Sequence, residues 1–372
     1  MNSTFLNQDE FAKQWTSNID KISERILQLF FYSKFFPIFS LLFGLGISMQ
    51  AIKQYEKNRL SFSFFARRMF FLFIFGVLHI LLLWSGDVLN IYAILGVLTT
   101  FFIKRSNKLI LVLSIIFLVF PFYDQLFNQL FKLLNFSPEV YLSDYNGEMV
   151  NQIIRNGTYA QGMKLRILEY LSNIPMLFGF LGPIALSMFF LGLYLGKNKI
   201  YESLADFIER IKTPLLFITI SANIYRVLFL FWLTKLEFYK IELIRTLLIK
   251  LMLISDVIMG LFYLWLIGWV WYCTKWKKLL IPLKYVGRMA LTNYILQSCI
   301  GLILFSSVGF KLYETLSPYQ TLIAAILVFI FQVIVSNIWL SYFKFGPLEW
   351  LWRCLTYKQI LTIKLKSTDV SN

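Results

Sequence analysis

The residues best suited to chemistry lie in one apolar stretch, residues 67–96, which contains the only histidine of the 372-residue chain, His79. An imidazole, whose reference pKa is about 6.5, is the side chain best suited to general acid–base work near neutral pH. Asp87 follows at a Trp84-Ser85-Gly86-Asp87 turn, where its carboxylate can orient or polarise the imidazole. We therefore take His79 and Asp87 as the candidate catalytic pair.

Each member of this pair also has a plainer interpretation. A histidine in a membrane helix often makes an interhelical hydrogen bond and nothing more. Asp87 stands before an apolar run, where it would cap the helix that follows. The two roles of Asp87 are compatible, because one carboxylate oxygen can cap the helix while the other faces a cavity.

Several other polar residues are candidates for the wall of a substrate cavity, because polar groups in apolar segments usually face a protein interior. They are Trp84, Arg226, Asp256, Asn293 and Gln297. Arg226 and Asp256 are expected at similar depths in neighbouring spans, so a structural ion pair is an equally good interpretation. The two amides also suit interhelical hydrogen bonds.

Arg67 and Arg68 would suit the phosphates of a nucleotide-like donor at the cytoplasmic face. The alternative is that they only anchor a helix at the positively charged side of the membrane. The three cysteines are far apart, and no Cys/His spacing predicts a metal site or a disulfide framework. We therefore expect no metal and no permanently bound cofactor.

Composition predicts an all-α, polytopic membrane protein. Hydrophobic residues make up 58% of the chain and mean hydropathy is +0.66, against roughly 45–50% apolar residues in soluble domains. Gly44 and Gly46 are expected to permit close helix packing. Nine spans of near 20 residues are predicted, at about 35–52, 67–85, 87–103, 108–123, 174–196, 213–234, 249–273, 288–309 and 318–340.

The basic residues give the orientation. Of the 36 Lys and Arg residues, 22 fall in the connections 53–68, 104–108, 197–212 and 274–288 and in the tail, against 13 in the alternate set. Cytoplasmic loops carry the excess, so the N-terminus is expected outside and the C-terminus in the cytoplasm. Because topology accounts for the net charge of +16, we expect no nucleic-acid partner.

The chain is therefore divided into five parts. They are a polar extracytoplasmic arm (1–34), four spans that include the His79/Asp87 hairpin (35–123), an extracytoplasmic amphipathic loop (124–173), five further spans (174–340) and a basic cytoplasmic tail (341–372).

Four stretches together resemble a known family. They are residues 34–46 (KFFPIFSLLFGLG), the stretch 67–96 described above, residues 287–298 (GRMALTNYILQS) and residues 343–357 (FKFGPLEWLWRCLTY). In order and spacing, from about residue 34 to 358, they are similar to the YeiB-like bacterial membrane proteins grouped as domain of unknown function 418. Members of that family usually begin with a further membrane helix carrying an Arg-Gly motif, which this sequence lacks, so ten spans are expected in an intact member.

The family is distantly similar to transmembrane acyltransferases, which transfer acetyl groups from cytoplasmic acetyl-coenzyme A to sugars across the membrane. That resemblance implies an acyl-CoA donor, a cell-envelope glycan or other polar acceptor, and a location in the bacterial cell membrane. His79 would then be the general base and Asp87 its orienting partner. Two alternatives stay open: a transporter or exporter of a small polar molecule, with Arg226, Asp256 and His79 along its pathway, and a non-catalytic membrane scaffold. The oligomeric state is left open.

Overall fold

The computed structural model describes residue 11, residues 13–56 and residues 61–365, so the ends of the predicted arm and tail lie outside the described residues. Helices dominate this part of the chain, which contains no strand beyond an isolated bridge between Phe343 and Lys364. The helices in order are α2 (Asn18–Phe30), α3 (Phe35–Tyr55), α4 (Phe62–Leu82), α5 (Leu89–Phe101), α6 (Asn107–Val119), α7 (Tyr123–Leu133), α8 (Gly147–Asn156), α9 (Tyr159–Ser172), α10 (Gly182–Lys197), α11 (Leu204–Phe231), α12 (Glu242–Cys273), α13 (Lys277–Arg288), α14 (Ala290–Phe305), α15 (Pro318–Tyr342) and α16 (Pro347–Tyr357).

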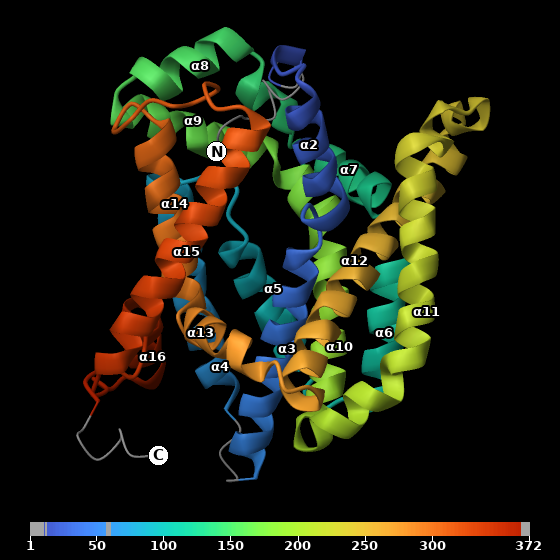
Figure 1. Cartoon of the computed structure of the whole chain (residues 1–372), viewed down its shortest axis with the longest axis vertical. Coiled ribbons are helices and arrows are strands. Elements are labelled where there is room, and N and C mark those ends of the chain that lie inside the picture. Colours follow the sequence, from blue (N-terminus) through green and yellow to red (C-terminus); the bar gives the residue numbers. More distant parts are fainter. Residues whose placement is uncertain (1–10, 12, 57–60, 366–372) are drawn as a thin grey trace.

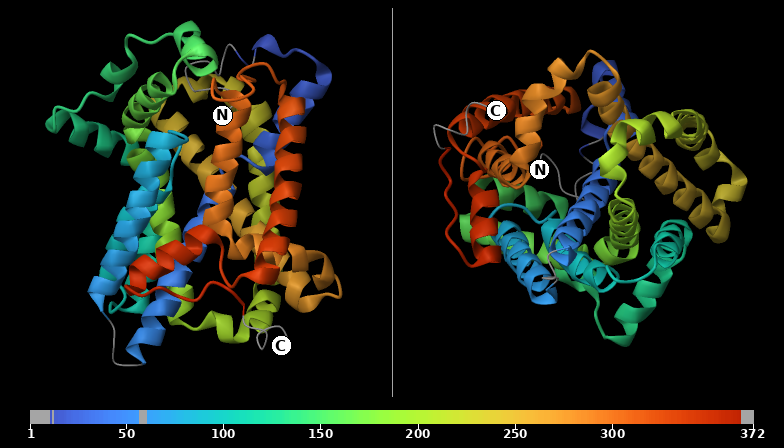
Figure 2. Two further views of the ribbon diagram at one scale, coloured as in Figure 1. Left: turned by 90° about the vertical axis from the view of Figure 1, so that its left-hand side faces the viewer. Right: turned by 90° about the horizontal axis from the view of Figure 1, so that it is seen from below.

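Most of the long helices run along the long axis of the molecule, and shorter helices close its two ends (Figures 1 and 2). Helices α8 and α9 lie across one end, and α13 and α16 lie at the other. Short 3-10 segments join the helices at Pro138–Leu142, Ile200–Ser203, Leu233–Lys235 and Glu237–Lys240, and a π-helical turn at Met176–Leu181 leads into α10. The predicted amphipathic segment 124–173 is thus built largely of helices α7, α8 and α9.

Helix α10 forms the centre of the core. Its sequence is apolar on every side, which is typical of a helix surrounded by protein. In the most apolar 18-residue stretch of Met176–Lys197, 72% of the residues are buried inside the protein, whereas 11% are buried in the corresponding stretch of α15. The main core cluster joins α10 to α3, α4 and α5. Helix α15 is also strongly apolar, but its large apolar side chains point outward, as expected where lipid is the solvent.

Each of the nine predicted spans overlaps a helix, but the count of nine is not confirmed. Among the residues that the structure describes, six helical segments are long and apolar enough to cross a membrane, or up to eight if two bent pairs each count as one span. The bends, 85° between α6 and α7 and 79° between α13 and α14, lie at the end of the predicted span 108–123 and at the start of the predicted span 288–309. Helix α5 has only 13 residues, which at ~1.5 Å per residue falls short of the ~30 Å hydrocarbon core.

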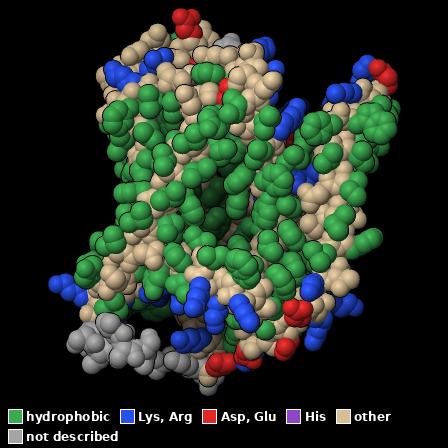
Figure 3. Space-filling model, viewed as in Figure 1, with side chains coloured by type: hydrophobic (Ala, Val, Ile, Leu, Met, Phe, Trp, Pro, Cys, Tyr) green, Lys and Arg blue, Asp and Glu red, His purple; other side chains and the backbone are tan. Residues whose placement is uncertain are grey.

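The surface agrees with a membrane protein. Hydrophobic side chains cover the middle of the face shown in Figure 3, and lysine and arginine side chains gather towards its two ends. A hollow lined by hydrophobic side chains opens near the centre of this face.

Close contact between α3 and α10 depends on two glycines. A Cβ atom at Gly44 would lie 2.2 Å from the Phe189 carbonyl oxygen, and one at Gly192 would lie 2.1 Å from the Leu41 carbonyl oxygen. The prediction that glycine permits close packing therefore holds for Gly44. It is wrong for Gly46, beside which a Cβ would meet nothing within 4 Å.

This difference predicts the outcome of a matched pair of variants. Gly192→Val should force α3 and α10 apart and lower the free energy of unfolding by at least about 1–3 kcal/mol, the usual cost of overpacking. Gly46→Val should change it little. Thermal unfolding of the two purified variants in detergent measures the difference, and equal unfolding midpoints would contradict the packing described here.

Candidate functional site

His79 and Asp87 face each other across the turn between α4 and α5. After α4 ends, the N–H groups of Leu83 and Trp84 both donate to the His79 carbonyl oxygen at 2.9 Å, which turns the chain back. The Nδ1 atom of His79 lies 3.0 Å from Oδ1 of Asp87, and both side chains are fully buried. The two atoms are close but do not meet hydrogen-bond geometry, so the pair is defined by its distance and burial.

Asp87 is fixed by further donors. Its Oδ2 accepts the N–H of Asn90 at 3.0 Å, in the manner of a helix cap, while Oδ1 accepts the hydroxyl of Tyr294 at 3.2 Å and faces His79. The two oxygens therefore divide the capping and orienting roles between them. Gly76 makes room for this arrangement, because a Cβ there would lie 2.7 Å from Asp87 Oδ2.

Ser298 and Tyr294 complete the site from α14, and the sequence analysis missed both. The Ser298 Oγ lies 2.7 Å from His79 Nε2, and the tyrosine ring lies 4.9 Å from the imidazole, between centroids. The two residues are four positions apart and so share one face of the helix. That spacing was visible in the quoted stretch 287–298, but nothing local in the sequence brings α14 beside α4.

The contacts assign the proton on the imidazole. A carboxylate at Nδ1 favours the tautomer with hydrogen on Nδ1, which leaves Nε2 as an acceptor. In that tautomer the Ser298 hydroxyl donates to Nε2 at 2.7 Å rather than to the Tyr294 carbonyl oxygen, which lies 3.4 Å from the same Oγ. Asp87, His79 and Ser298 thus stand in the order carboxylate, base and hydroxyl, the arrangement by which proteins activate a hydroxyl group.

A cavity of about 250 Å³ lies next to the α4–α5 turn, and its lining includes Trp84, Ser85 and Gly86 but not His79, Asp87, Tyr294 or Ser298. Trp84 lines it, as predicted for a substrate cavity, and the indole ring lies 6.4 Å from the His79 ring in an edge-on arrangement. The remaining walls come from the turn before Asp87, from α9 and from the end of α14, among them Ser85, Arg166, Glu169 and Phe305. Burial raises the pKa of the Glu169 carboxyl, against the opposing effects of the Ser85 hydrogen bond and of Arg166.

Of the five predicted cavity residues only Trp84 lines this cavity, and two of the other four belong to α14. Asn293 bonds towards α15, where its Nδ2 donates to the Ser336 Oγ at 2.9 Å and its backbone carbonyl oxygen accepts Gln332 Nε2 at 2.7 Å. Gln297 is exposed on the outside of α14. The predicted residues lie on the helix that reaches His79, but the side chain of that helix that contacts His79 belongs to Ser298, which follows Gln297.

Arg67 and Arg68 both pack against α16. The Nε of Arg67 donates to the Thr356 carbonyl oxygen at 2.6 Å. The guanidinium of Arg68 stacks 3.7 Å from the ring centroid of Trp352, whose indole N–H donates back to the Arg68 carbonyl oxygen at 2.9 Å. These contacts attach the start of α4 to α16, which agrees with an anchoring role for both arginines. A role in holding donor phosphates stays a prediction.

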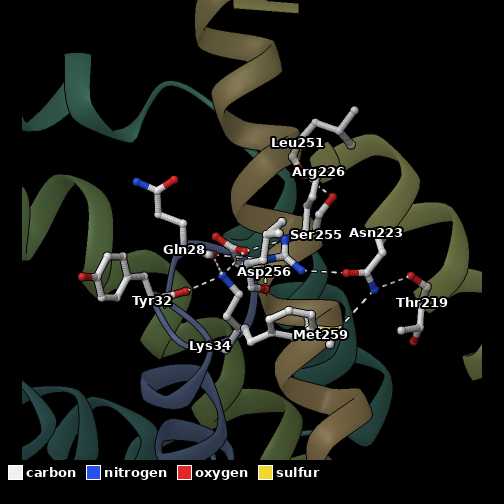
Figure 4. A network of polar contacts seen from close by, with 12 residues as sticks. Gln28, Tyr32, Lys34, Thr219, Asn223, Arg226, Leu251, Ser255, Asp256 and Met259 are labelled. Carbon is white, nitrogen blue, oxygen red and sulfur yellow. Dashed lines mark hydrogen bonds and ion pairs between the residues drawn. The ribbon is translucent and has the colours of Figure 1, made fainter. Parts of the chain in front are cut away.

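Arg226 and Asp256 form the predicted ion pair, and Lys34 is a third member that the sequence analysis missed (Figure 4). Asp256 Oδ1 lies 3.0 Å from Arg226 Nε and 2.9 Å from Lys34 Nζ. Lys34 also donates to the carbonyl oxygens of Gln28 and Tyr32, and Arg226 to those of Gln28 and Leu29.

These carbonyl groups mark the C-terminal end of α2, where a helix has unpaired acceptors and a negative dipole end. The two cations therefore cap α2 and fix the break before α3, while Asp256 balances part of their charge. This function of the cluster is structural. Its members come from α11, α12 and the α2–α3 junction, whereas the His79 site is built by α4, α5 and α14.

Comparison with known proteins gives matches only to uncharacterised relatives. Residues 195–359 match the family model described as "Protein of unknown function (DUF418)". The "Uncharacterized protein YxaH" of Bacillus subtilis is 28% identical over 369 residues, which cover 95% of this chain and 87% of that protein. An "Uncharacterized 39.9 kDa protein in amylase 3'region" of Bacillus acidopullulyticus is 29% identical over 363 residues, covering 94% and 87%.

The "Uncharacterized protein YeiB" of Escherichia coli is 44% identical over 81 residues, which are 22% of this chain and 20% of that protein. No solved structure gives a significant match. These matches confirm the similarity to YeiB-like DUF418 proteins that the four sequence stretches predict.

Proposed function

We propose that this YeiB-like chain is a membrane-embedded acyltransferase of the bacterial cell membrane, which moves an acyl group from a cytoplasmic acyl-CoA to a polar acceptor outside. The observation that supports it best is the buried Asp87–His79 pair. Its unprotonated Nε2 accepts the Ser298 hydroxyl at 2.7 Å, and a cavity lies next to the same turn. That is the arrangement required for general-base activation of a hydroxyl.

In the proposed reaction His79 Nε2 takes the proton from an acceptor hydroxyl, and the acceptor oxygen attacks the thioester carbonyl of the donor. The carbon–sulfur bond then breaks, and the proton leaves with the CoA thiol. Asp87 stabilises the imidazolium that forms between these steps. The acceptor hydroxyl would take the place at Nε2 that Ser298 fills in the structure.

The donor would bind near Arg67 and Arg68, roughly 17 Å from His79 along α4. The buried face of α4 between these points carries Met69, Leu72 and Gly76, which are closely packed. We therefore place the thioester arm along another side of α4.

Ser298 is assigned a positioning role, because a nucleophilic serine needs oxyanion donors beside it. Ser298 is in the middle of α14, where backbone N–H groups are used within the helix, unlike a serine at a strand–helix turn. Ser298→Ala should therefore lower turnover less than about tenfold, far less than loss of a general base.

The measurement is CoA release by the purified variant in lipid vesicles, together with a search for acylated protein. A Ser298→Ala variant as inactive as one lacking His79, with an acyl group on Ser298 in the wild type, would instead establish a two-step reaction. The second candidate function is a transporter with Arg226 and Asp256 along its pathway. It has less support, because both side chains bond within the cluster that caps the C-terminal end of α2.

A further inference from the structure

Two polar side chains that line the cavity next to the α4–α5 turn, Glu169 and Arg166, each have one buried atom without a hydrogen-bond partner. Glu169 is 6% exposed, and its Oε2 accepts the Ser85 hydroxyl at 2.7 Å, but its Oε1 is buried without a hydrogen-bond partner. Arg166 donates from Nε to the Leu81 carbonyl oxygen at 3.3 Å, but its Nη2 is likewise buried and unpartnered. Buried polar groups are normally paired, because an unpaired one destabilises the folded protein.

The two free groups are of opposite kinds. Carboxylate Oε1 can only accept a hydrogen bond, and guanidinium Nη2 can only donate one. A hydroxyl group both donates and accepts, so a ligand with hydroxyl groups would satisfy both positions. A ligand whose only charge is an ammonium group would be repelled by Arg166, and one whose only charge is a carboxylate or phosphate would be repelled by Glu169, whereas a zwitterion could satisfy both side chains.

Size and walls narrow the ligand further. The cavity volume of about 250 Å³ lies below the ~300–1,000 Å³ of pockets for drug-sized ligands. Aromatic side chains of Trp84, Tyr159 and Phe305 line it, and the Arg166 guanidinium lies 5.1 Å from the centroid of the Tyr159 ring. Such walls suit the apolar faces of a small saturated ring.

We propose that Glu169 and Arg166 form a binding subsite for one small, neutral, polyhydroxylated ring, with Trp84 packing against its face. Its position supports a link to the reaction, since Ser85 and Gly86 of the cavity wall directly precede Asp87. The assignment of this ring to the acyl acceptor rests on the proposed function, whereas binding of the ring to the subsite does not.

The test uses three probes of equal ring size and different charge: D-glucose, D-glucosamine and D-glucuronate. Binding to the full-length protein in detergent is measured by titration calorimetry without any acyl donor. We expect saturable binding of D-glucose, weaker binding of both charged probes, and a loss of about tenfold or more in D-glucose affinity for Glu169→Gln and for Arg166→Lys.

Two features separate this proposal from the catalytic one. Glu148→Gln, which changes an exposed carboxylate on α8 outside the cavity, should bind D-glucose like the wild type, and the titration contains no acyl donor, so its result does not depend on transfer. Monodisperse elution and wild-type unfolding midpoints show that the variants are folded. Absence of saturable D-glucose binding, preference for either charged probe, or unchanged affinity in folded Glu169→Gln and Arg166→Lys would each overturn the subsite.

Discussion

Replacement of His79 by glutamine should lower the rate of acyl transfer by about 10²–10⁴-fold, the usual contribution of a general base. Glutamine can still form a hydrogen bond with Ser298, but it cannot take a proton from an acceptor hydroxyl. Asp87→Asn should have a comparable effect, because an amide no longer fixes the tautomer that leaves Nε2 free. CoA release by the purified variants in vesicles measures both.

The matched control is Gln297→Ala, an exposed side chain on the helix that carries Ser298. It should keep the wild-type rate, since it does not face the site. If folded His79→Gln turned over like the wild type, His79 would be only an interhelical hydrogen-bond partner, and the proposed mechanism would be wrong.

The Asp256→Asn variant should lose about 3–5 kcal/mol of stability, the typical cost of removing one partner from a buried ion pair. The side chains of Lys34, Arg226 and Asp256 are 1%, 0% and 9% exposed. Without the carboxylate, two buried cations face each other with only neutral partners, namely backbone carbonyl oxygens and the side-chain Oδ1 of Asn223. Chemical or thermal unfolding in detergent measures the change.

Glu237→Gln serves as its control, because the Lys240–Glu237 pair is 75% and 87% exposed and exposed pairs contribute little. Its unfolding free energy should differ from that of the wild type by less than ~1 kcal/mol. Equal stability of Asp256→Asn and the wild type would remove the structural function of the cluster and restore it as a candidate substrate site.

Local spacing predicted the parts of the site that are close together in the chain. His79 and Asp87 are joined by a tight turn, so their contact follows from one hairpin. Arg226 and Asp256 pair because their depths in adjacent helices match. Lys34 was missed because the break between α2 and α3, which brings the C-terminal carbonyl groups of α2 to these cations, has no clear signal in an apolar sequence.

Contacts between distant segments could not be predicted in the same way. Ser298 is 219 residues from His79, and the choice between it and Gln297 depends on the rotation of α14, which a mostly apolar helix does not reveal. Glu169 and Arg166 were assigned to a surface loop, and only the folding of α9 over the α4–α5 turn brings them to the cavity. The span count of nine is not confirmed for a physical reason as well: bent helix pairs and a short helix produce the same apolar pattern as straight spans.

The central claim is most directly tested by acyl transfer across a sealed membrane. Purified protein is reconstituted into vesicles with a cell-envelope saccharide extract trapped inside, and acetyl-CoA with a labelled acetyl group is added outside. The proposed mechanism predicts labelled acetyl esters inside the vesicles, free CoA outside, and neither with His79→Gln. Folded wild-type protein that neither binds nor consumes acetyl-CoA would contradict it.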